Sequence, residues 1–191
     1  MSTDWDAEAA TFDDAPDHGL HDPEVRDAWA ALLHEEVPPR SDVVDLGCGT
    51  GSLAVLLAGQ GHRVRALDLS PAMVARARVK VEGLDVAVDV GDAMDPVVEG
   101  PVDVVLARHV LWALPDPVAA LRRWAGLLRP GGRLVLVEGC WSTGAGLAAE
   151  TLRLLAEEAY DAVEVLPLSD QDALWGGPVS DERYLLRAVR R

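Results

Sequence analysis

The segment Val43-Val44-Asp45-Leu46-Gly47-Cys48-Gly49-Thr50-Gly51 joins an apolar run to a glycine-dense turn, and a second apolar run ends at Asp68. Gly47 and Gly49 lack a Cβ atom, so the backbone can turn tightly there and a ligand can approach it closely. Asp68 follows about 20 positions later, where the second strand of a β-α-β unit ends and a carboxylate can accept hydrogen bonds from both ribose hydroxyls. The two features predict a nucleoside-bearing cofactor at the carboxyl ends of two neighbouring strands.

The glycine spacing distinguishes two classes of cofactor. A dinucleotide site uses Gly-x-Gly-x-x-Gly and holds a pyrophosphate at a helix N-terminus. Here the spacing is Gly-x-Gly-x-Gly, and Asp45 stands two residues before Gly47. A carboxylate aimed at this turn repels phosphate and attracts an ammonium group. The pattern disfavours a nicotinamide-dependent oxidoreductase without eliminating it.

The segment resembles motif I of the class I S-adenosylmethionine-dependent methyltransferases, in which an acidic residue precedes Gly-x-Gly-x-Gly. The resemblance extends over about residues 22–191 and implies S-adenosyl-L-methionine as cofactor. It also implies methyl transfer to a small-molecule acceptor. Two other functions stay open: a cyclase or decarboxylase that uses the same cofactor, and a non-catalytic partner that only binds it.

Alternating strand and helix patterns predict an α/β fold with a doubly wound, mostly parallel seven-stranded sheet that is Rossmann-like. The expected strands are residues 42–46, 63–67, 85–90, 102–107, 133–138, 163–168 and 183–189. The expected helices are residues 22–36, 52–59, 72–81, 116–128 and 145–159. The turn-rich residues 95–101 replace one crossover helix by a loop. Residues 169–182 contain no helix-length segment, so the last two strands are expected to form an antiparallel hairpin.

The chain has 191 residues, which predicts a single methyltransferase domain over 1–191, with residues 1–21 as an N-terminal cap segment and 22–191 as the core. The net charge of −15 argues against a nucleic-acid substrate, because such binding depends on Lys and Arg that neutralise phosphates. No membrane partner, signal peptide or metal site is expected, and the predicted location is cytoplasmic. Whether a homodimer completes the acceptor site stays open.

The candidate cofactor-binding residues follow the first three predicted strands. Asp92 can accept a hydrogen bond from the adenine amine, and the backbone N–H of Ala93 can donate to a ring nitrogen. Leu69 and Met73 can enclose the adenine, or can simply pack in the core. The full predicted set is Asp45, Gly47, Cys48, Gly49, Gly51, Asp68, Leu69, Met73, Asp92, Ala93, Met94, Arg108 and Phe12.

The acceptor side is less clearly marked. His109 follows the fourth predicted strand, and a histidine pKa near 6.5 suits a general base. The alternative is that His109 only shapes the pocket. Phe12 and His18 belong to a segment similar to one that folds over the cofactor in ubiquinone/menaquinone-biosynthesis methyltransferases, and His18 is a weaker base candidate. Trp141 and Trp175 follow or precede strands near the acceptor side and either line its rim or have a purely structural role, which is the commoner case. The acceptor atom (O, N, S or C) is not identified.

Overall fold

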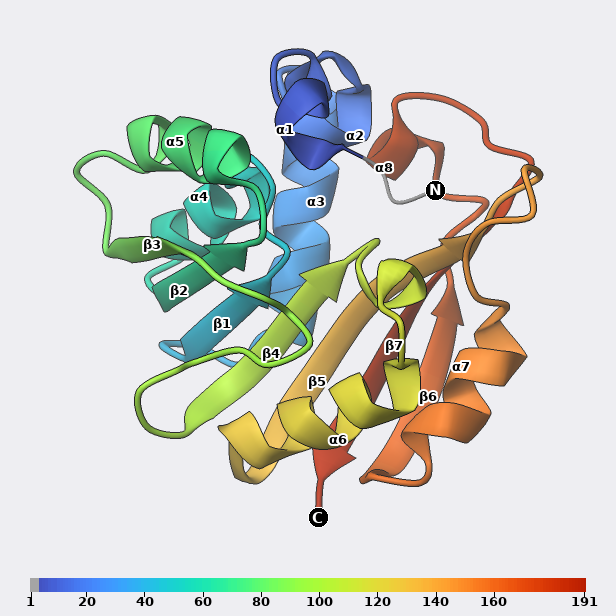
Figure 1. Cartoon of the computed structure of the whole chain (residues 1–191). Coiled ribbons are helices and arrows are strands. Elements are labelled where there is room, and N and C mark those ends of the chain that lie inside the picture. Colours follow the sequence, from blue (N-terminus) through green and yellow to red (C-terminus); the bar gives the residue numbers. More distant parts are fainter. Residues whose placement is uncertain (1–3) are drawn as a thin grey trace.

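One seven-stranded sheet with helices on both faces forms the fold (Figure 1), and the computed structural model describes residues 4–191. The strands are β1 (Asp42–Leu46), β2 (Arg63–Asp68), β3 (Val86–Val90), β4 (Val102–Arg108), β5 (Leu128–Cys140), β6 (Tyr160–Pro167) and β7 (Glu182–Arg190). The α-helices are α1 (Trp5–Glu8), α2 (Pro16–Gly19), α3 (Pro23–Glu36), α4 (Ser52–Gly59), α5 (Pro71–Lys80), α6 (Pro117–Leu127), α7 (Ala149–Ala156) and α8 (Asp172–Trp175). Two 3-10 helices are η1 (Phe12–Asp14) and η2 (Leu111–Ala113).

The strand order is β3-β2-β1-β4-β5-β7-β6, and β7 runs antiparallel to both of its neighbours. The predicted Rossmann-like sheet and its C-terminal antiparallel hairpin are therefore confirmed. The order reverses between β1 and β4, and in open α/β sheets ligands bind beyond the carboxyl ends of the strands at such a point. This topology locates the expected site at the ends of β1, β2 and β4.

Three of the longer helices begin with the same two-residue motif, a capping side chain followed by proline. Asp22, Ser70 and Asp116 each precede a proline, and their side chains accept hydrogen bonds from the backbone nitrogens of Glu24, Met73 and Ala119. Such a cap satisfies a backbone N–H group that has no partner within the helix, and proline fits the first helical position. The starts of α3, α5 and α6 are thus determined by local sequence.

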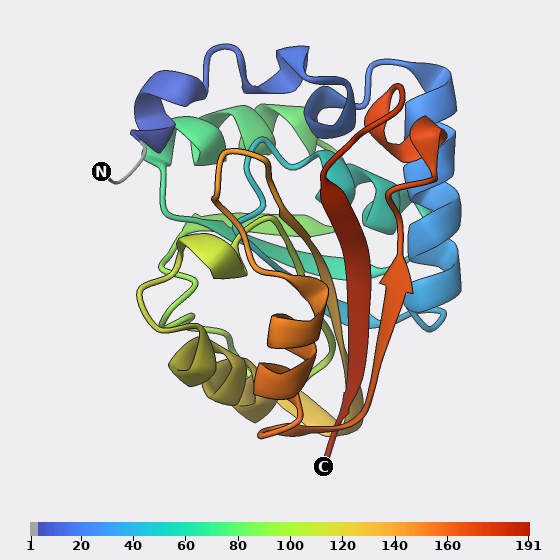
Figure 2. The same cartoon turned by 90° about the vertical axis from the view of Figure 1, so that its right-hand side faces the viewer.

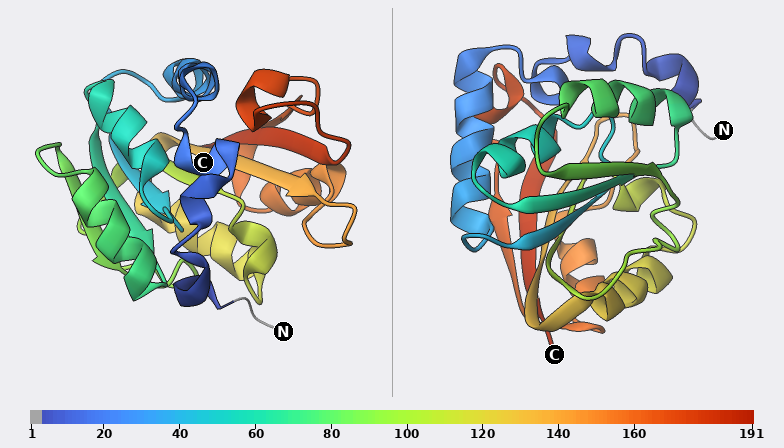
Figure 3. Two further views of the ribbon diagram at one scale, coloured as in Figure 1. Left: turned by 90° about the horizontal axis from the view of Figure 1, so that it is seen from above. Right: turned by 90° about the vertical axis from the view of Figure 1, so that its left-hand side faces the viewer.

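The apolar residues of the strands divide between two cores, one on each face of the sheet. Helices α3, α4, α5 and α8 cover one face, with the fully buried Trp29 of α3 as its largest side chain. Helices α6 and α7 cover the other face, with Trp124 of α6 equally buried. Figure 3 shows α3 and α6 on opposite sides of the sheet. Because strand side chains alternate between faces, β4 contributes Leu106 to the first core and Val105 to the second.

Two predicted elements begin at positions that differ by about four residues or more from the structure. The helix expected over 145–159 spans only Ala149–Ala156, because Gly144 and Gly146 adopt positive φ angles and the preceding residues form a loop. In this loop the backbone nitrogen of Leu147 donates to the carbonyl oxygen of Gly139 (2.9 Å). The strand expected over 133–138 spans Leu128–Cys140, so residues 129–132 lie within β5, where the pairing register with β4 shifts.

Residues 4–20 cross the carboxyl ends of the strands. Figure 2 shows this segment along the top of the molecule, above α5, and α1 contacts α5. We call residues 4–20 the cap; residues 1–3 of the predicted cap lie outside the described residues. Among the described residues, no helix combines the length and apolar character needed to span a bilayer.

Candidate functional site

A cavity of about 520 Å³ lies at the carboxyl ends of the parallel strands. Its lining includes residues directly after β1, β2, β3, β4 and β5, such as Gly47, Leu69, Gly91, His109 and Trp141. The cap closes one side of it. The cavity therefore occupies the position that the strand order predicts.

The glycine turn (residues 47–51) forms the floor of this cavity. Gly47, Gly49 and Gly51 all have positive φ angles, which glycine adopts without strain. A Cβ atom on Gly49 would lie 2.9 Å from the Phe12 ring, so the missing side chain also lets the cap approach. Gly51 does not line the cavity; a Cβ atom there would lie 3.1 Å from Ala77 of α5. Its place in the structure is at the contact between α4 and α5.

Asp68 joins the end of β2 to the glycine turn. Its Oδ2 atom accepts a hydrogen bond from the backbone nitrogen of Gly49 (2.8 Å), and Oδ1 accepts one from Ser70 (2.9 Å). Burial raises the pKa of Asp68, and the two backbone hydrogen bonds oppose that shift. Each carboxylate oxygen has a further lone pair, so Asp68 can still accept hydrogen bonds from a ligand.

Asp45 is a buried carboxylate with unused hydrogen-bonding capacity. Only 2% of it is exposed, and its Oδ2 atom has no hydrogen-bond partner among the described residues. Burial raises its pKa to about 7, although the positive charge of Arg108 acts in the opposite direction. A buried polar atom without a partner is costly. A cationic ligand in the cavity would remove that cost.

The adenine-side candidates are spread along the ends of β2 and β3. Leu69, Met73, Asp92 and Ala93 line the cavity, with Leu69 largely exposed and Met73 buried. One oxygen of Asp92 accepts a hydrogen bond from the backbone nitrogen of Met94 (2.8 Å), which stabilises the turn after β3. Met94 itself is not among the lining residues and packs against the core beneath α6.

Cys48 lines the cavity within the glycine turn. Burial and the neighbouring carboxylates raise the pKa of its thiol well above the ordinary value. The side chain is therefore a neutral thiol. This environment is the opposite of the one that activates a nucleophilic cysteine.

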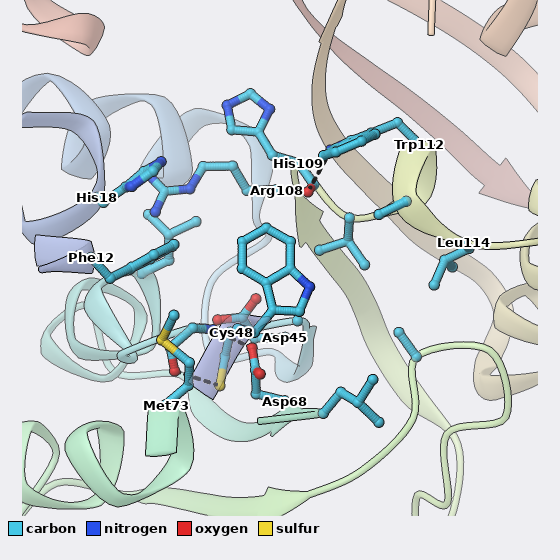
Figure 4. Close-up of a pocket in the computed structure, with 18 of the residues that line it drawn as sticks. Phe12, His18, Asp45, Cys48, Asp68, Met73, Arg108, His109, Trp112 and Leu114 are labelled. Atoms are coloured by element: carbon cyan, nitrogen blue, oxygen red, sulfur yellow. Dashed lines mark hydrogen bonds between the residues drawn. The ribbon is translucent and has the colours of Figure 1, made fainter. Parts of the chain in front are cut away.

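Phe12, His18 and Arg108 form the cap side of the cavity (Figure 4). The rings of Phe12 and His18 are stacked, with centroids 4.3 Å apart. Arg108 is half-buried, its guanidinium donates a hydrogen bond to the carbonyl oxygen of Asp17, and it lies over the Trp29 ring. Burial lowers the pKa of His18, and nearby Asp17 opposes that shift. Arg108 thus places a positive charge beside the cap.

Polar contacts attach the cap to the core at two points. The carboxylate of Asp6 accepts hydrogen bonds from the Ser70 hydroxyl and from the backbone nitrogen of Ala72 (3.1 Å). Asp13 accepts from the Thr50 hydroxyl and pairs with Lys80, whose Nζ atom lies 2.8 Å from Oδ2. Both anchors engage the N-terminal turn of α5 or the glycine turn, so the cap position is coupled to the cofactor side.

His109 begins the acceptor side. Its backbone is in the left-handed region (φ +57°), which is uncommon for a residue with a side chain. Its backbone nitrogen donates to Val137 of β5 (2.8 Å), which holds this conformation. Neither ring nitrogen has a partner among the described residues, and burial together with Arg108 and Arg183 lowers its pKa well below the usual value. The imidazole is neutral and can accept a hydrogen bond.

Glu138 stabilises the backbone directly after His109. It is fully buried on β5, and its Oε1 atom accepts hydrogen bonds from the backbone nitrogens of Val110 (3.0 Å) and Leu111 (2.7 Å). Burial raises its pKa to about 8, so the carboxyl is mostly protonated at neutral pH. Glu138 does not line the cavity and fixes the start of η2.

Trp112 and Trp141 form an aromatic wall of the cavity next to His109. Trp141 contacts the His109 ring edge to face (5.2 Å) and Trp112 in the same way (5.4 Å), and the Trp112 Nε1 atom donates to the carbonyl oxygen of His109 (2.9 Å). Figure 4 shows Trp112 on the side of His109 away from the cap. Trp175, a candidate for the same rim, is buried behind this wall and does not line the cavity.

The sequence did not identify two lining residues that stand out in the structure. Trp5 of α1 reaches the cavity because the cap folds over α5. Arg183 of β7 reaches it because β7 pairs with β5, which brings Arg183 opposite Gly139. No spacing in the sequence marks either residue, since both depend on long-range pairing.

Comparisons with known proteins agree with this architecture. A family profile described as a methyltransferase domain matches residues 44–136. A ubiquinone biosynthesis O-methyltransferase from Xanthomonas campestris pv. campestris (strain B100) is 38% identical over 138 residues, which cover 69% of this chain and 54% of that relative. The chain thus spans about half the length of the curated relatives it matches.

Two solved structures share the fold over almost the whole chain. The N-methyltransferase NodS from Bradyrhizobium japonicum WM9, solved with S-adenosyl-L-homocysteine, has a TM-score of 0.77 at 22% identity, covering 98% of this chain and 99% of NodS. A putative methyltransferase in complex with the Haloferax volcanii Trm112 methyltransferase activator has a TM-score of 0.76 at 25% identity, with 100% and 99% covered.

Proposed function

We propose that this chain, which matches a methyltransferase-domain profile over residues 44–136, is a class I S-adenosylmethionine-dependent methyltransferase that transfers the methyl group of this cofactor to a small-molecule acceptor. The observation that carries the proposal is Asp45, a buried carboxylate with a free oxygen at the glycine turn. A ligand with an ammonium group supplies the missing partner, whereas a pyrophosphate would add repulsion.

The residues present fit the other parts of this cofactor. Asp68 can accept hydrogen bonds from the ribose, since two of its lone pairs remain free. Arg108 can pair with the methionine carboxylate, because its charge lies close enough to Asp45 to affect the pKa of that carboxyl. Leu69 and Met73 offer apolar contact to the adenine, and Asp92 a hydrogen-bond acceptor.

When bound, S-adenosylmethionine supplies an electrophilic methyl group that needs no further activation. The protein then has two tasks: it holds the acceptor in line with the methyl group, and it keeps water away. The cap, with the stacked Phe12 and His18, covers the cofactor side. His109, neutral and without partners for its ring nitrogens, is proposed to accept the hydrogen bond or the proton of the acceptor.

Titration calorimetry on ligand-stripped protein tests the proposed cofactor. S-adenosylmethionine and S-adenosylhomocysteine should bind, and NAD should not. The Asp45→Asn variant should weaken binding, while Asp89→Asn on the exposed part of β3 should not. Binding of the dinucleotide without the sulfonium compound would contradict the proposal.

Turnover is tested separately from binding. Acceptors are incubated with S-adenosylmethionine, and S-adenosylhomocysteine is quantified by mass spectrometry. Methylthioadenosine or an unmethylated cyclised product would instead indicate a different use of the cofactor. Binding without any turnover across acceptor classes would favour a non-catalytic partner. The cytoplasmic location, the absence of a nucleic-acid partner and a single domain with residues 1–21 as its cap remain part of this proposal.

A further inference from the structure

Arg183 is the cationic residue on the acceptor side of the cavity. Its side chain is 13% exposed and lines the cavity, and its Nε atom is buried without a hydrogen-bond partner among the described residues. An unsatisfied buried guanidinium nitrogen is costly unless a ligand completes it.

Two aromatic rings and a glycine surround the Arg183 guanidinium. Its Cζ atom lies 5.0 Å from the centre of the Trp141 ring and 5.4 Å from that of Trp175. A Cβ atom on Gly139, its partner across the β5–β7 pair, would lie 3.2 Å from Nη1 and 3.1 Å from Cδ. The absence of a side chain at Gly139 therefore leaves room for Arg183. Two aromatic rings and one glycine place this cation.

The charge of Arg183 is only partly compensated. Asp181 approaches Nη2 at 3.4 Å, a long contact, and its other oxygen accepts a hydrogen bond from the backbone nitrogen of Ser142 (2.6 Å). His109 is neutral, and Trp112 and Trp141 carry no charge. Four carboxylates of the described residues line the cavity away from Arg183: Asp45 within β1, Asp68 at the end of β2, Asp92 after β3 and Asp17 in the cap. The acceptor side thus presents a cation among aromatic rings.

We propose that the acceptor is a planar small molecule with an anionic group, whose carboxylate or comparable oxyanion binds Arg183 while its ring lies against Trp112 and Trp141. This inference rests on the proposed function and identifies the substrate class of the same site. A guanidinium is suited to such a group because its donors match carboxylate geometry. Methyl transfer to a neutral or cationic acceptor would leave the buried Nε atom of Arg183 without a partner among the described residues.

The methionine carboxylate of the cofactor is the competing ligand for Arg183. We assign that carboxylate to Arg108, because Arg108 and Asp45 interact electrostatically and Asp45 is the expected partner of the ammonium group. Arg183 is not among the charges that shift the pKa of Asp45, and its guanidinium lies against Trp141 on the acceptor side. This assignment is tested by the same variants.

The experiment measures binding of two aromatic carboxylates to the protein saturated with S-adenosylhomocysteine at pH 7.5. The probes are 3-hydroxybenzoate and indole-3-carboxylate, each compared with its uncharged carboxamide by tryptophan fluorescence and ligand-detected NMR. In the wild-type protein at least one carboxylate should bind about 10-fold or more tightly than its amide, as expected for a charge-assisted hydrogen bond.

Three variants separate the roles. Arg183→Met should abolish the preference for the carboxylate and leave the amide affinity within about twofold, which a merely structural role would not do. Arg183→Lys should keep part of the preference, since lysine retains the charge but not the planar fork. Arg26→Met, an exposed position on α3, removes the same charge and should change nothing.

The outcomes also separate this inference from the proposed function. Equal affinity for carboxylates and amides, or no carboxylate binding, in protein that binds S-adenosylhomocysteine overturns the anionic acceptor alone. If Arg183→Met weakens S-adenosylhomocysteine binding as much as carboxylate binding, Arg183 serves the cofactor and the inference fails. Failure of the wild-type protein to bind S-adenosylhomocysteine overturns the proposed function and the inference with it. If Arg183→Met does not fold, the inference is still tested by the carboxylate-over-amide preference of the wild-type protein and by its reduction in Arg183→Lys.

Discussion

The Oδ2 atom of Asp68 lies 2.8 Å from the backbone nitrogen of Gly49, so the end of β2 is hydrogen bonded to the turn that follows β1. The same carboxylate caps the backbone of Ser70 just before α5. One side chain therefore shapes the site and is also available to a ligand. This double role affects how its replacement should be interpreted.

Asp68→Ala should weaken binding of S-adenosylmethionine by about 1–3 kcal/mol, the range for a hydrogen-bonded charged group. It should also lower the melting temperature, because two backbone donors lose their acceptor. Asp68→Asn keeps one oxygen acceptor and should retain more stability than affinity. Calorimetry and thermal unfolding measure the two effects. Wild-type affinity in Asp68→Ala would refute the ribose role.

Asp45→Asn should stabilise the ligand-free protein at pH 8 while weakening the cofactor complex. The folded carboxyl keeps its proton up to about pH 7, whereas the unfolded one loses it near pH 4. Between these values the folded state binds more protons, so Asp45 makes the free energy of unfolding fall as pH rises. Asparagine removes that loss, worth about 1–3 kcal/mol at pH 8, and should give no advantage at pH 4. Urea unfolding at both values checks this, with Asp89→Asn as the exposed control.

Cofactor binding should release a proton at pH 6. An ammonium group next to Asp45 favours the ionised carboxylate and lowers its pKa from about 7 in the free protein. Affinity should therefore increase as pH rises from 6 to 8 and then level off. Calorimetry in buffers with different ionisation enthalpies counts the protons. The release should disappear in Asp45→Asn, and proton uptake in the wild type would contradict the assignment.

Local sequence determined the order of strands and helices in the β-α-β units, the glycine turn and the starts of α3, α5 and α6, because each depends on neighbouring residues. Asp22, Ser70 and Asp116 precede prolines and cap these three helices, which begin within about one residue of the predicted starts. Residues 95–101 are expected to form a loop in place of a crossover helix, and the structure has no helix there. These features could be predicted without knowing any long-range contact.

The acceptor side depends on pairings that the sequence does not display. Arg183 meets Trp141 only because β7 inserts antiparallel between β5 and β6. The left-handed backbone of His109 is held by its hydrogen bond to Val137 on another strand. The lowered pKa of its imidazole comes mainly from burial, which the value near 6.5 for free histidine does not include.

Lys80→Met should loosen the cap. The Lys80 Nζ atom contacts Asp13 (2.8 Å), Thr50 (2.9 Å) and Ser52 (2.9 Å), so it joins the cap to the glycine turn. Its loss should increase hydrogen exchange in residues 4–20 and weaken cofactor binding by about 1 kcal/mol. Arg78→Met removes an exposed cation from the same helix and serves as the control. Unchanged exchange in the cap of Lys80→Met would show that the Asp6 contacts suffice.

His109→Ala should reduce turnover much more than cofactor affinity. If the imidazole takes the proton that the methylated substrate loses, kcat should fall by about a hundredfold. Binding of S-adenosylhomocysteine should change by no more than about twofold. His109→Asn tests the backbone separately, because asparagine tolerates the left-handed conformation but has no basic nitrogen. Both variants should lose kcat equally if the imidazole matters. If only His109→Ala is impaired, the strained backbone is the important feature; if neither is impaired, His109 only shapes the pocket.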